Sequence, residues 1–379
     1  MYKKNVHIFY IVSTIICILT IIFIVINYKL NNIKKNLIIG YIYQYSWSMV
    51  KNYFISLINA GFKNVDVVMF IKDVPQETIE KIKSYGVIIY PMPDNPYLSK
   101  NCQRWELYAN YLKENKGKYN MVLHTDVRDT IFQKDIFQFY NSKKSFFEVA
   151  EEENTLEERT NKRWMLTLCD KTVYNEYFKN KPVICAGLAI GTPDKFIEYN
   201  NSIIKMAHGK IFGIRGDQRY LNYLVYHDNI FNDCITVKNN TNSHLMHIGV
   251  TKRKKIILDN NNNILNFNGE IASVVHQYER HKDLVKILDK KFNEDNLNYT
   301  AYKNMQQSKN ILSKKEIIKF VFIIFIVVII IVISIIYIIK KSKNYIFIKR
   351  NKLRKVKIIN NIKNKRRKKF HAYKKIKIK

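Results

Sequence analysis

The fold class expected of this chain follows from the stretch Lys118-Tyr-Asn-Met-Val-Leu-His-Thr-Asp126-Val-Arg-Asp129. Its apolar run at 121–123 predicts a buried parallel strand. The polar residues that follow place Asp126 and Asp129 just beyond the strand's carboxyl end, where open α/β sheets bind ligands. Two carboxylates beside His124 suit a hard divalent cation that carries a phosphorylated ligand. An Asp-rich turn that caps the next helix is the alternative interpretation.

Strand and helix patterns alternate on both sides of this stretch. Strands are predicted at 36–43, 65–71, 87–90, 145–150, 182–190 and 274–275, and helices at 46–59, 76–84, 103–114, 194–207, 217–226 and 283–291. Residues 151–162 are interpreted as a charged loop or short helix. This order predicts an α/β, Rossmann-like fold with a mostly parallel sheet and helices on both faces.

Two segments are apolar enough to cross a membrane, since residues 5–28 and 320–339 carry no charged side chain and one crossing needs about 20 residues. The first could instead be a cleaved signal peptide, but its apolar run is long and no small-residue cleavage site follows. The expected organisation is a cytoplasmic N-terminus (1–6), a transmembrane anchor (7–28), an α/β domain (36–292), a stem (293–317), a transmembrane helix (318–339) and a basic cytoplasmic tail (340–379).

Positive charge is concentrated in the tail, where residues 340–379 hold 19 of the 64 Lys and Arg residues and no acid. A basic segment directly after a membrane span is the expected cytoplasmic flank and binds anionic lipid. This position favours a membrane surface over nucleic acid as its partner. The domain between the spans would then face the lumen of the secretory pathway, in the Golgi or endoplasmic reticulum.

The cysteines and glycosylation sequons in the middle of the chain bear on this location. Cys102, Cys169, Cys185 and Cys234 allow one or two disulfides in an oxidising compartment, and the absence of a C-x-x-C spacing argues against a zinc site. Asn-x-Ser/Thr sequons begin at Asn200, Asn239 and Asn298. Both features are consistent with a lumenal domain.

Four separated blocks carry a family pattern. They are Asp126 with Asp135-Ile-Phe137, Cys185-Ala-Gly187, Gly216-Asp217-Gln218-Arg-Tyr-Leu-Asn222, and Val274-Val-His276-Gln-Tyr-Glu-Arg-His281. Together, over roughly residues 36–292, they resemble glycosyltransferases of the GT-A fold, most closely the retaining glycogenin and lipopolysaccharide-galactosyltransferase type. The resemblance implies a hexosyltransferase-like enzyme that moves a sugar from a nucleoside-diphosphate donor, a UDP-sugar, to a glycan, glycoprotein or glycolipid acceptor.

The resemblance also implies a metal site. In the family an Asp-x-Asp ends the strand; Asp126 matches the second Asp, whereas His124 stands in place of the first. Either His124 or Asp129 would fill that role, and Asp129 is preferred. The late family histidine matches His276, with His247 as its rival. The expected ligands of Mn²⁺, or Mg²⁺, are therefore Asp126, Asp129 and His276.

Residues expected to bind the donor come from the remaining blocks. Asp217 and Gln218 match the family pair that contacts the donor sugar near its anomeric carbon, although Asp217 is also a candidate helix N-cap. Gly187 would let the sugar approach the backbone. Asp126, through the metal, and Arg128 would bind the nucleotide. Arg104, Arg128 and Arg215 are each phosphate partners or ordinary surface or ion-pair arginines.

Two other classes of protein fit the same sequence. One is a catalytically silent GT-A-like domain that acts as a lumenal scaffold or lectin. Two departures from the family pattern favour it: His124, and Cys185, where a packed or disulfide-bonded cysteine replaces the family's polar Asn or Ser. The other is a membrane structural protein that acts through its basic tail.

Overall fold

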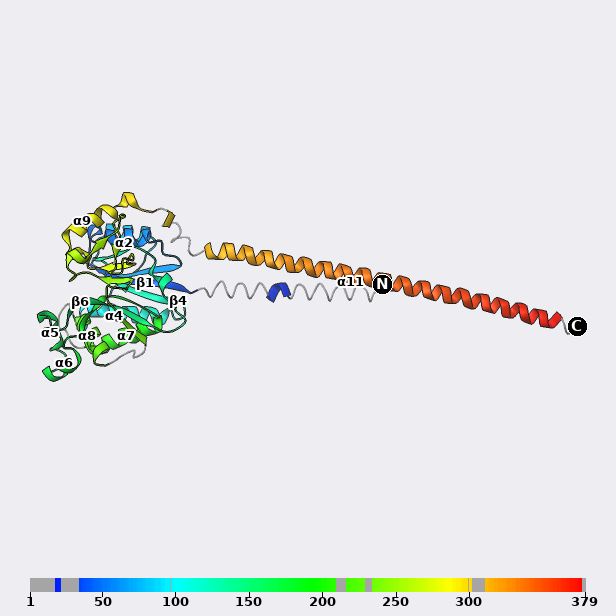
Figure 1. The fold of residues 1–379 in the computed structure, drawn as a ribbon, viewed down its shortest axis with the longest axis horizontal. Helices are drawn as coiled ribbons and strands as arrows, with labels where there is room; N and C mark the ends of the chain where they lie inside the picture. Colours follow the sequence, from blue (N-terminus) through cyan, green and yellow to red (C-terminus); the bar gives the residue numbers. More distant parts are fainter. Residues whose placement is uncertain are drawn as a thin grey trace. The chain divides into compact units, whose positions relative to one another are not determined.

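The computed structural model describes residues 18–21, 34–95, 97–208, 216–228, 234–298, 300–301 and 311–376. The chain divides into two compact units, Met1–Ile311 and Leu312–Lys379. The first unit is a mixed α/β domain in which strands lie between two layers of helices (Figure 1). The second belongs to α11 (Ile311–Ile376).

A seven-stranded sheet forms the centre of the α/β domain. Its order is β3 (Ile88–Pro91), β2 (Val65–Lys72), β1 (Lys35–Tyr43), β4 (Tyr119–Thr125), β7 (Pro182–Gly191), β6 (Phe147–Thr155) and β8 (Ile235–Lys238). Strand β7 is antiparallel to both its neighbours, and the other neighbouring pairs are parallel. The sheet is therefore mixed but mostly parallel, as the strand and helix alternation predicts.

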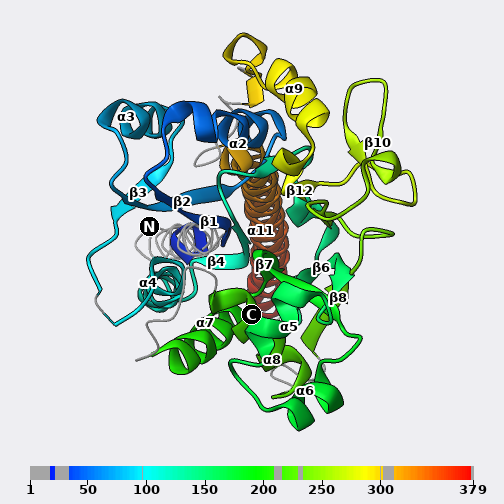
Figure 2. The same cartoon turned by 90° about the vertical axis from the view of Figure 1, so that its left-hand side faces the viewer.

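Helices cover both faces of this sheet (Figure 2). On one face α2 (Trp47–Asn59) and α3 (Gln76–Ser84) share a buried cluster with the strands, and on the other α4 (Lys100–Glu114), α7 (Pro193–Ala207) and α8 (Gly216–Tyr226) do so. Strand β1 supplies Ile38 to the first cluster and Leu37 and Ile39 to the second. Because both faces are covered, its sequence is apolar throughout rather than alternating.

A smaller three-stranded sheet completes the domain. Strand β12 (Val274–His276) lies between β5 (Thr130–Phe132) and β9 (Leu245–His247), and α9 (Lys282–Lys291) packs in the same buried cluster. His276 pairs with Thr130 on one side and with His247 on the other. This register determines which side chains meet at the edge of the larger sheet.

Shorter elements connect these layers. They are η1 (Ile136–Phe139), α5 (Arg159–Met165), α6 (Lys171–Tyr177), η3 (Arg253–Lys255), the hairpin of β10 (Ile257–Leu258) and β11 (Ile264–Leu265), η4 (Tyr278–Arg280) and η5 (Glu294–Asn296).

The main departure from the expected elements is at residues 151–155, which continue β6 rather than forming a charged loop. Glu151 pairs with Ile184 of β7, and Thr155 pairs with Pro182. Their charge hides the strand in the sequence, because Glu152 points into a polar cavity instead of an apolar core. The helix expected in this region is limited to α5.

The structure contradicts the expected disulfides and excludes one of the three sequons. All four cysteines between residues 102 and 234 are free; Cys102, for example, lies in the buried cluster that includes α4. Asn200 is fully buried on α7, where a glycan could not be attached to the folded domain.

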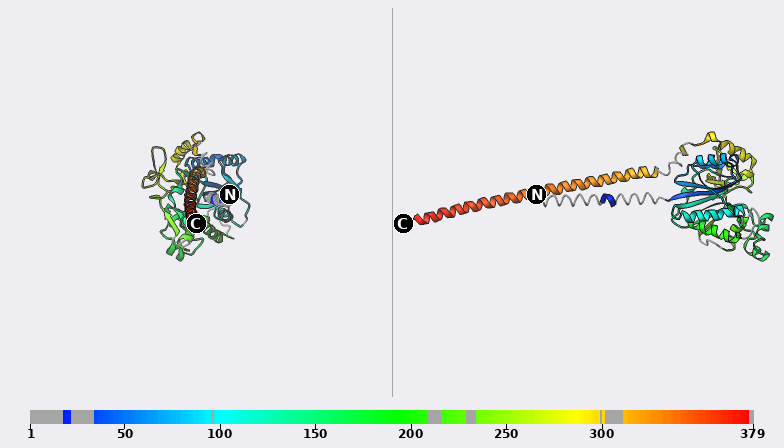
Figure 3. Two further views of the ribbon diagram at one scale, coloured as in Figure 1. Left: turned by 90° about the vertical axis from the view of Figure 1, so that its right-hand side faces the viewer. Right: turned by 180° about the vertical axis from the view of Figure 1, so that it is seen from behind.

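Helix α11 runs continuously through residues 311–376 (Figure 3) and contains both the segment 318–339 and most of the basic tail. The segment 7–28 lies outside the described residues except for 18–21, and so do residues 302–310 of the expected stem. Within the part of the chain that the structure describes, no helix combines the length and apolar character needed to cross a membrane.

Candidate functional site

A polar cavity of about 850 Å³ opens where β1 and β4 end. Residues from further elements, among them α4, α5, β6, β7, α8 and β12, contribute to its lining. Its polar lining includes Tyr41, Tyr43, Tyr45, Asp126, Arg128, Asp129, Glu152, Asp217, Gln218 and His276. Residues from distant parts of the sequence therefore face one space large enough for a small-molecule ligand.

Asp126, Asp129 and His276 converge at this cavity. One ligand atom of each lies within 4.8 Å of the others. The convergence follows from the two sheets: Asp126 comes directly after β4, and Asp129 directly before β5, whose first residue, Thr130, pairs with His276. The sheet edge thus supplies the carboxylates, and the small sheet brings the imidazole to them.

The spacing of these groups fits a divalent cation. His276 Nε2 is buried and makes no hydrogen bond, yet it lies 3.4 Å from Asp129 Oδ1 and 3.7 Å from Asp126 Oδ2. An octahedral ion with ligands at about 2.1 Å holds adjacent ligand atoms about 3 Å apart and opposite ones about 4 Å apart. Two carboxylates and an imidazole are a donor set that suits Mn²⁺ or Mg²⁺.

Burial alone would lower the pKa of His276, but the charges of Cys185, Asp129 and Asp126 raise it well above its ordinary value. A cation at Nε2 must therefore displace a proton, so its binding depends on pH.

Arg104 of α4 links the two acidic sides of the cavity. Its guanidinium is 4 % exposed and donates to Asp126 Oδ1 at 2.5 Å and to Asp217 Oδ2 at 2.6 Å. It also lies over the rings of Tyr41 and Trp105, with Cζ 5.0 and 4.6 Å from their centroids. Burial would lower the pKa of Arg104, but the two carboxylates raise it above its ordinary value, so it stays a cation.

Arg104 pairs with Oδ1 of Asp126, and the second carboxylate oxygen, Oδ2, faces His276. Burial raises the pKa of Asp126, but Arg104 and His276 outweigh this and hold it well below the usual range. Asp126 is therefore a carboxylate, as a ligand for a hard cation must be.

Asp217 and Gln218 lie in the first turn of α8. Asp217 is 5 % exposed and accepts a hydrogen bond from the Gln218 amide at 3.0 Å. Because α8 begins at Gly216, Asp217 lies inside the helix and its carboxylate serves Arg104 rather than a simple N-cap. Further along the helix, Asn222 exchanges two 2.9 Å hydrogen bonds with the backbone of Ile184, which fixes α8 against β7.

Gly187 of β7 lies directly against the ligand cluster. A Cβ added there would lie 2.6 Å from Asp126 Oδ2 and 2.6 Å from His276 Cε1. The Gly187 carbonyl also accepts a hydrogen bond from the Asp126 amide at 2.8 Å. Only glycine leaves room for both side chains at this position.

The structure distinguishes the alternative metal ligands that the sequence left open, His124 and His247, from the clustered residues. His124 packs against Trp105, with ring centroids 4.7 Å apart, and its Nε2 lies 3.2 Å from the Ala186 carbonyl; burial lowers its pKa to about 3. Among the described residues, His124 joins neither group of potential ligands, whereas Asp129 does. His247 is also not grouped with the carboxylates; it lies on β9, with its ring centroid 5.3 Å from that of His276.

The arginines named from the sequence have different environments. Arg128 is half-exposed at the cavity wall and lies 3.3 Å from Glu279 and 3.9 Å from Asp129. Arg104 is an ion-pair residue, one of the two roles considered for it. Arg215 lies outside the described residues.

Glu152 was missed by the sequence analysis. It lines the cavity, burial raises the pKa of its carboxyl to about 7, and its Oε1 lies 3.8 Å from His247 Nε2. The available signal was the period of two that continues from residues 147–150, which places Glu152 on the same strand face as Glu148 and Ala150.

The fold and site together define an α/β protein with a carboxylate–imidazole cluster at the edge of a mostly parallel sheet. No protein-family model and no curated protein matches the chain. Among solved structures, it is similar to the glycosyltransferase GlyE of Streptococcus pneumoniae TIGR4, with 12 % sequence identity and a TM-score of 0.40; the match covers 71 % of this chain and 62 % of that chain. Similarity at this level assigns no function, which has to come from the site itself.

Proposed function

We propose that this protein is a metal-dependent glycosyltransferase that moves a sugar from a nucleoside-diphosphate donor, a UDP-sugar, to a glycan, glycoprotein or glycolipid acceptor. The observation that carries the proposal is the meeting of Asp126, Asp129 and His276 in a cavity that Asp217 and Gln218 also line. The cavity volume, about 850 Å³, is in the range of small-molecule sites.

In this proposal Asp126, Asp129 and His276 hold Mn²⁺ or Mg²⁺, which when bound neutralises the diphosphate leaving group. Arg128 contacts the phosphates from the cavity wall. Asp217 and Gln218 bind the donor sugar near the reacting carbon, with retention of configuration as the expected outcome.

Arg104 is a positioning residue. By bridging Asp126 and Asp217 it fixes the distance between the metal-binding side and the sugar-binding side of the cavity. Because Gly187 has no side chain, it leaves the space between Asp126 and His276 open.

We further propose that segments 7–28 and 318–339 anchor the protein in a secretory-pathway membrane, Golgi or endoplasmic reticulum, with the domain lumenal and the basic tail on anionic lipid. The absence of charged side chains from residues 7–28 and 320–339, and the 19 basic residues after the second segment, support this. Resistance of the protein to carbonate extraction from membranes tests it; release into the soluble fraction would contradict it.

The test of the activity compares Asp126→Asn with Asp228→Asn, a control at an exposed carboxylate that pairs with the neighbouring His227. Asn is preferred to Ala because Ala would leave buried Arg104 with a single partner. Mn²⁺-dependent hydrolysis of a panel of nucleotide-sugars should be lost in Asp126→Asn and kept in Asp228→Asn. Unchanged turnover in Asp126→Asn would remove the assignment, and binding of a nucleotide-sugar without any turnover would favour a silent scaffold or lectin.

A further inference from the structure

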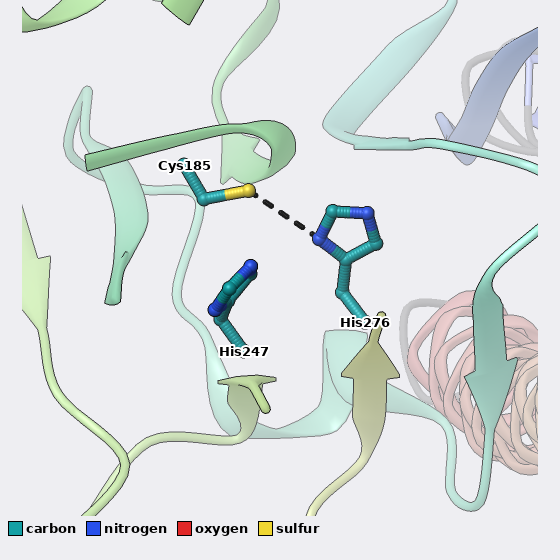
Figure 4. Close-up of side chains that lie close together, drawn as sticks. All are labelled: Cys185, His247 and His276. Carbon is teal, nitrogen blue, oxygen red and sulfur yellow. Dashed lines mark hydrogen bonds between the residues drawn. The ribbon is translucent and has the colours of Figure 1, made fainter. Parts of the chain in front are cut away.

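A second group of ligating side chains adjoins the carboxylate cluster and shares one residue with it. Cys185, His247 and His276 lie on β7, β9 and β12, and one ligand atom of each is within 4.8 Å of the others. Their exposed fractions are 2 %, 0 % and 1 %. Figure 4 shows the Cys185 thiol and the two imidazole rings around a common space.

The polar atoms that lack a partner in this group belong to His247. Neither of its ring nitrogens has a hydrogen-bond partner in the described protein. Cys185 Sγ accepts from the Gly187 amide at 3.3 Å and lies 3.3 Å from His276 Nδ1. A buried polar atom left without a partner costs about 1–3 kcal/mol, so a buried imidazole with two such atoms indicates a ligand. Burial lowers the pKa of His247 to about 3, which keeps its lone pair available.

The chemistry of the three ligands differs from that of the neighbouring cluster. Thiolate and imidazole favour Zn²⁺ and similar borderline-soft ions, whereas carboxylates favour Mg²⁺ and Mn²⁺. Glu152, whose Oε1 lies 3.8 Å from His247 Nε2, is placed to act as a fourth ligand or to orient the imidazole. Three or four ligands of this kind are a usual zinc set.

We propose that Cys185, His247 and His276 form a thiolate-containing site for a borderline-soft divalent cation such as Zn²⁺, and that this ion competes with Mn²⁺ for His276. The first half stands on the cluster alone; the competition rests on the proposed function, because it requires the Mn²⁺ site. The sequence argued against zinc because C-x-x-C is absent, but here the ligands come from three separate strands.

The competition follows because the two ring nitrogens of His276 point toward different groups of ligands. His276 Nδ1 faces Cys185 Sγ at 3.3 Å, and Nε2 faces Asp129 Oδ1 at 3.4 Å. A neutral imidazole has one lone pair on nitrogen and one N–H. Zn²⁺ at Nδ1 displaces the proton of that nitrogen and the thiol proton of Cys185, both of which go to solvent, and it leaves the proton on Nε2, facing the carboxylates. Mn²⁺ at Nε2 leaves the proton on Nδ1. Each ion therefore lowers the affinity of the other by the same factor.

The experiment titrates the metal-free full-length protein with Co²⁺, a spectroscopic substitute for Zn²⁺ that gives a thiolate-to-metal charge-transfer band. One equivalent should produce the band. Cys185→Ser should abolish it, while Cys102→Ser, a matched control at another buried free cysteine, should keep it. His247→Gln should weaken Co²⁺ binding by at least about tenfold, which tests the site without touching the thiol. No band in the wild-type protein, or a band that survives Cys185→Ser, would overturn the site.

Competition is measured by repeating the titration with saturating Mn²⁺, whose own binding is followed by electron paramagnetic resonance. The apparent dissociation constant of Co²⁺ should rise, and Asp129→Asn should remove this rise while keeping the thiolate band. An unchanged Co²⁺ affinity with Mn²⁺ bound would refute the sharing of His276. If Mn²⁺ does not bind at all, the proposed function fails, while the thiolate band still decides the second site.

Discussion

Replacing Arg104 with Met should destabilise the α/β domain strongly and in a metal-dependent way. Met keeps most of the packing volume over Trp105 and Tyr41 but removes the cation that joins Asp126 and Asp217. Breaking a buried ion pair from one side costs about 3–5 kcal/mol. The Arg104–Asp217 pair meets this description because its side chains are 4 % and 7 % exposed, whereas Asp126, at 34 %, contributes less.

Thermal unfolding measures the effect. At about 2–4 °C per kcal/mol for a domain of this size, the midpoint should fall by roughly 10 °C. A cation bound at Asp126 supplies positive charge that Arg104 no longer provides, so Mn²⁺ should raise the midpoint of Arg104→Met by more than that of the wild-type protein. Adding Asp217→Asn to Arg104→Met should recover part of the loss, because a neutral amide replaces the unpaired buried charge.

The matched control is Lys100→Met on the same helix, whose partner is the exposed Asp94. A surface pair of this kind contributes about 0–1 kcal/mol, so the midpoint should barely move. The reasoning is refuted if Arg104→Met unfolds within about 2 °C of the wild-type protein, or if its deficit is the same with and without Mn²⁺.

Three further predictions use single side chains. Gly187→Ala should abolish Mn²⁺ binding, measured by electron paramagnetic resonance, because its Cβ would lie 2.6 Å from both Asp126 Oδ2 and His276 Cε1. Burial gives Glu152 a pKa of about 7 in the folded domain, against an ordinary value of 4.5. Its contribution to stability is therefore full below pH 4.5 and is lost as pH rises through 7, by about 3 kcal/mol in all. In metal-free protein, Glu152→Gln should flatten the fall in unfolding midpoint between pH 5 and 8. Asn222→Ala removes both bonds from α8 to the β7 backbone and should cost about 2–4 kcal/mol, measured by urea unfolding.

Each of these predictions has a result that contradicts it. Normal Mn²⁺ affinity in Gly187→Ala would show that the cluster tolerates a methyl group and is not a tight cation site. A pH profile of Glu152→Gln that matches the wild-type profile would assign the slope to another group. An Asn222→Ala protein as stable as the wild-type protein would mean that water replaces the amide.

The sequence predicted the layers of the fold well because they depend on local patterns. Runs such as 36–43 and 65–71 are apolar on both faces, which only a covered parallel strand requires, and the helices between them show clear ends. The antiparallel direction of β7 was not predictable, since nothing in residues 182–191 records which way the chain enters the sheet. Charge likewise concealed the outer half of β6.

The candidate site was predictable in part, for a related reason. Asp126 and His276 were chosen by their match to the family pattern, and Asp129 as the preferred replacement for the first Asp of that pattern. The structure brings the three together; their role as ligands stays a prediction. Arg104 could not be assigned from the sequence, because its function depends on α4 covering the face of the sheet beneath both carboxylates. Cys185 was weighed as a disulfide or packing residue, whereas it faces His276, since its partners come from strands far away in the chain.

The pairing of Thr130 with His276 has a consequence for how the protein matures. A contact between residues so distant along the chain forms only after the intervening segment has folded, because loop closure opposes it earlier. Cation affinity should therefore appear at the end of refolding, after the central strands are protected from hydrogen exchange. Manganese binding would then report that β12 has paired with β5.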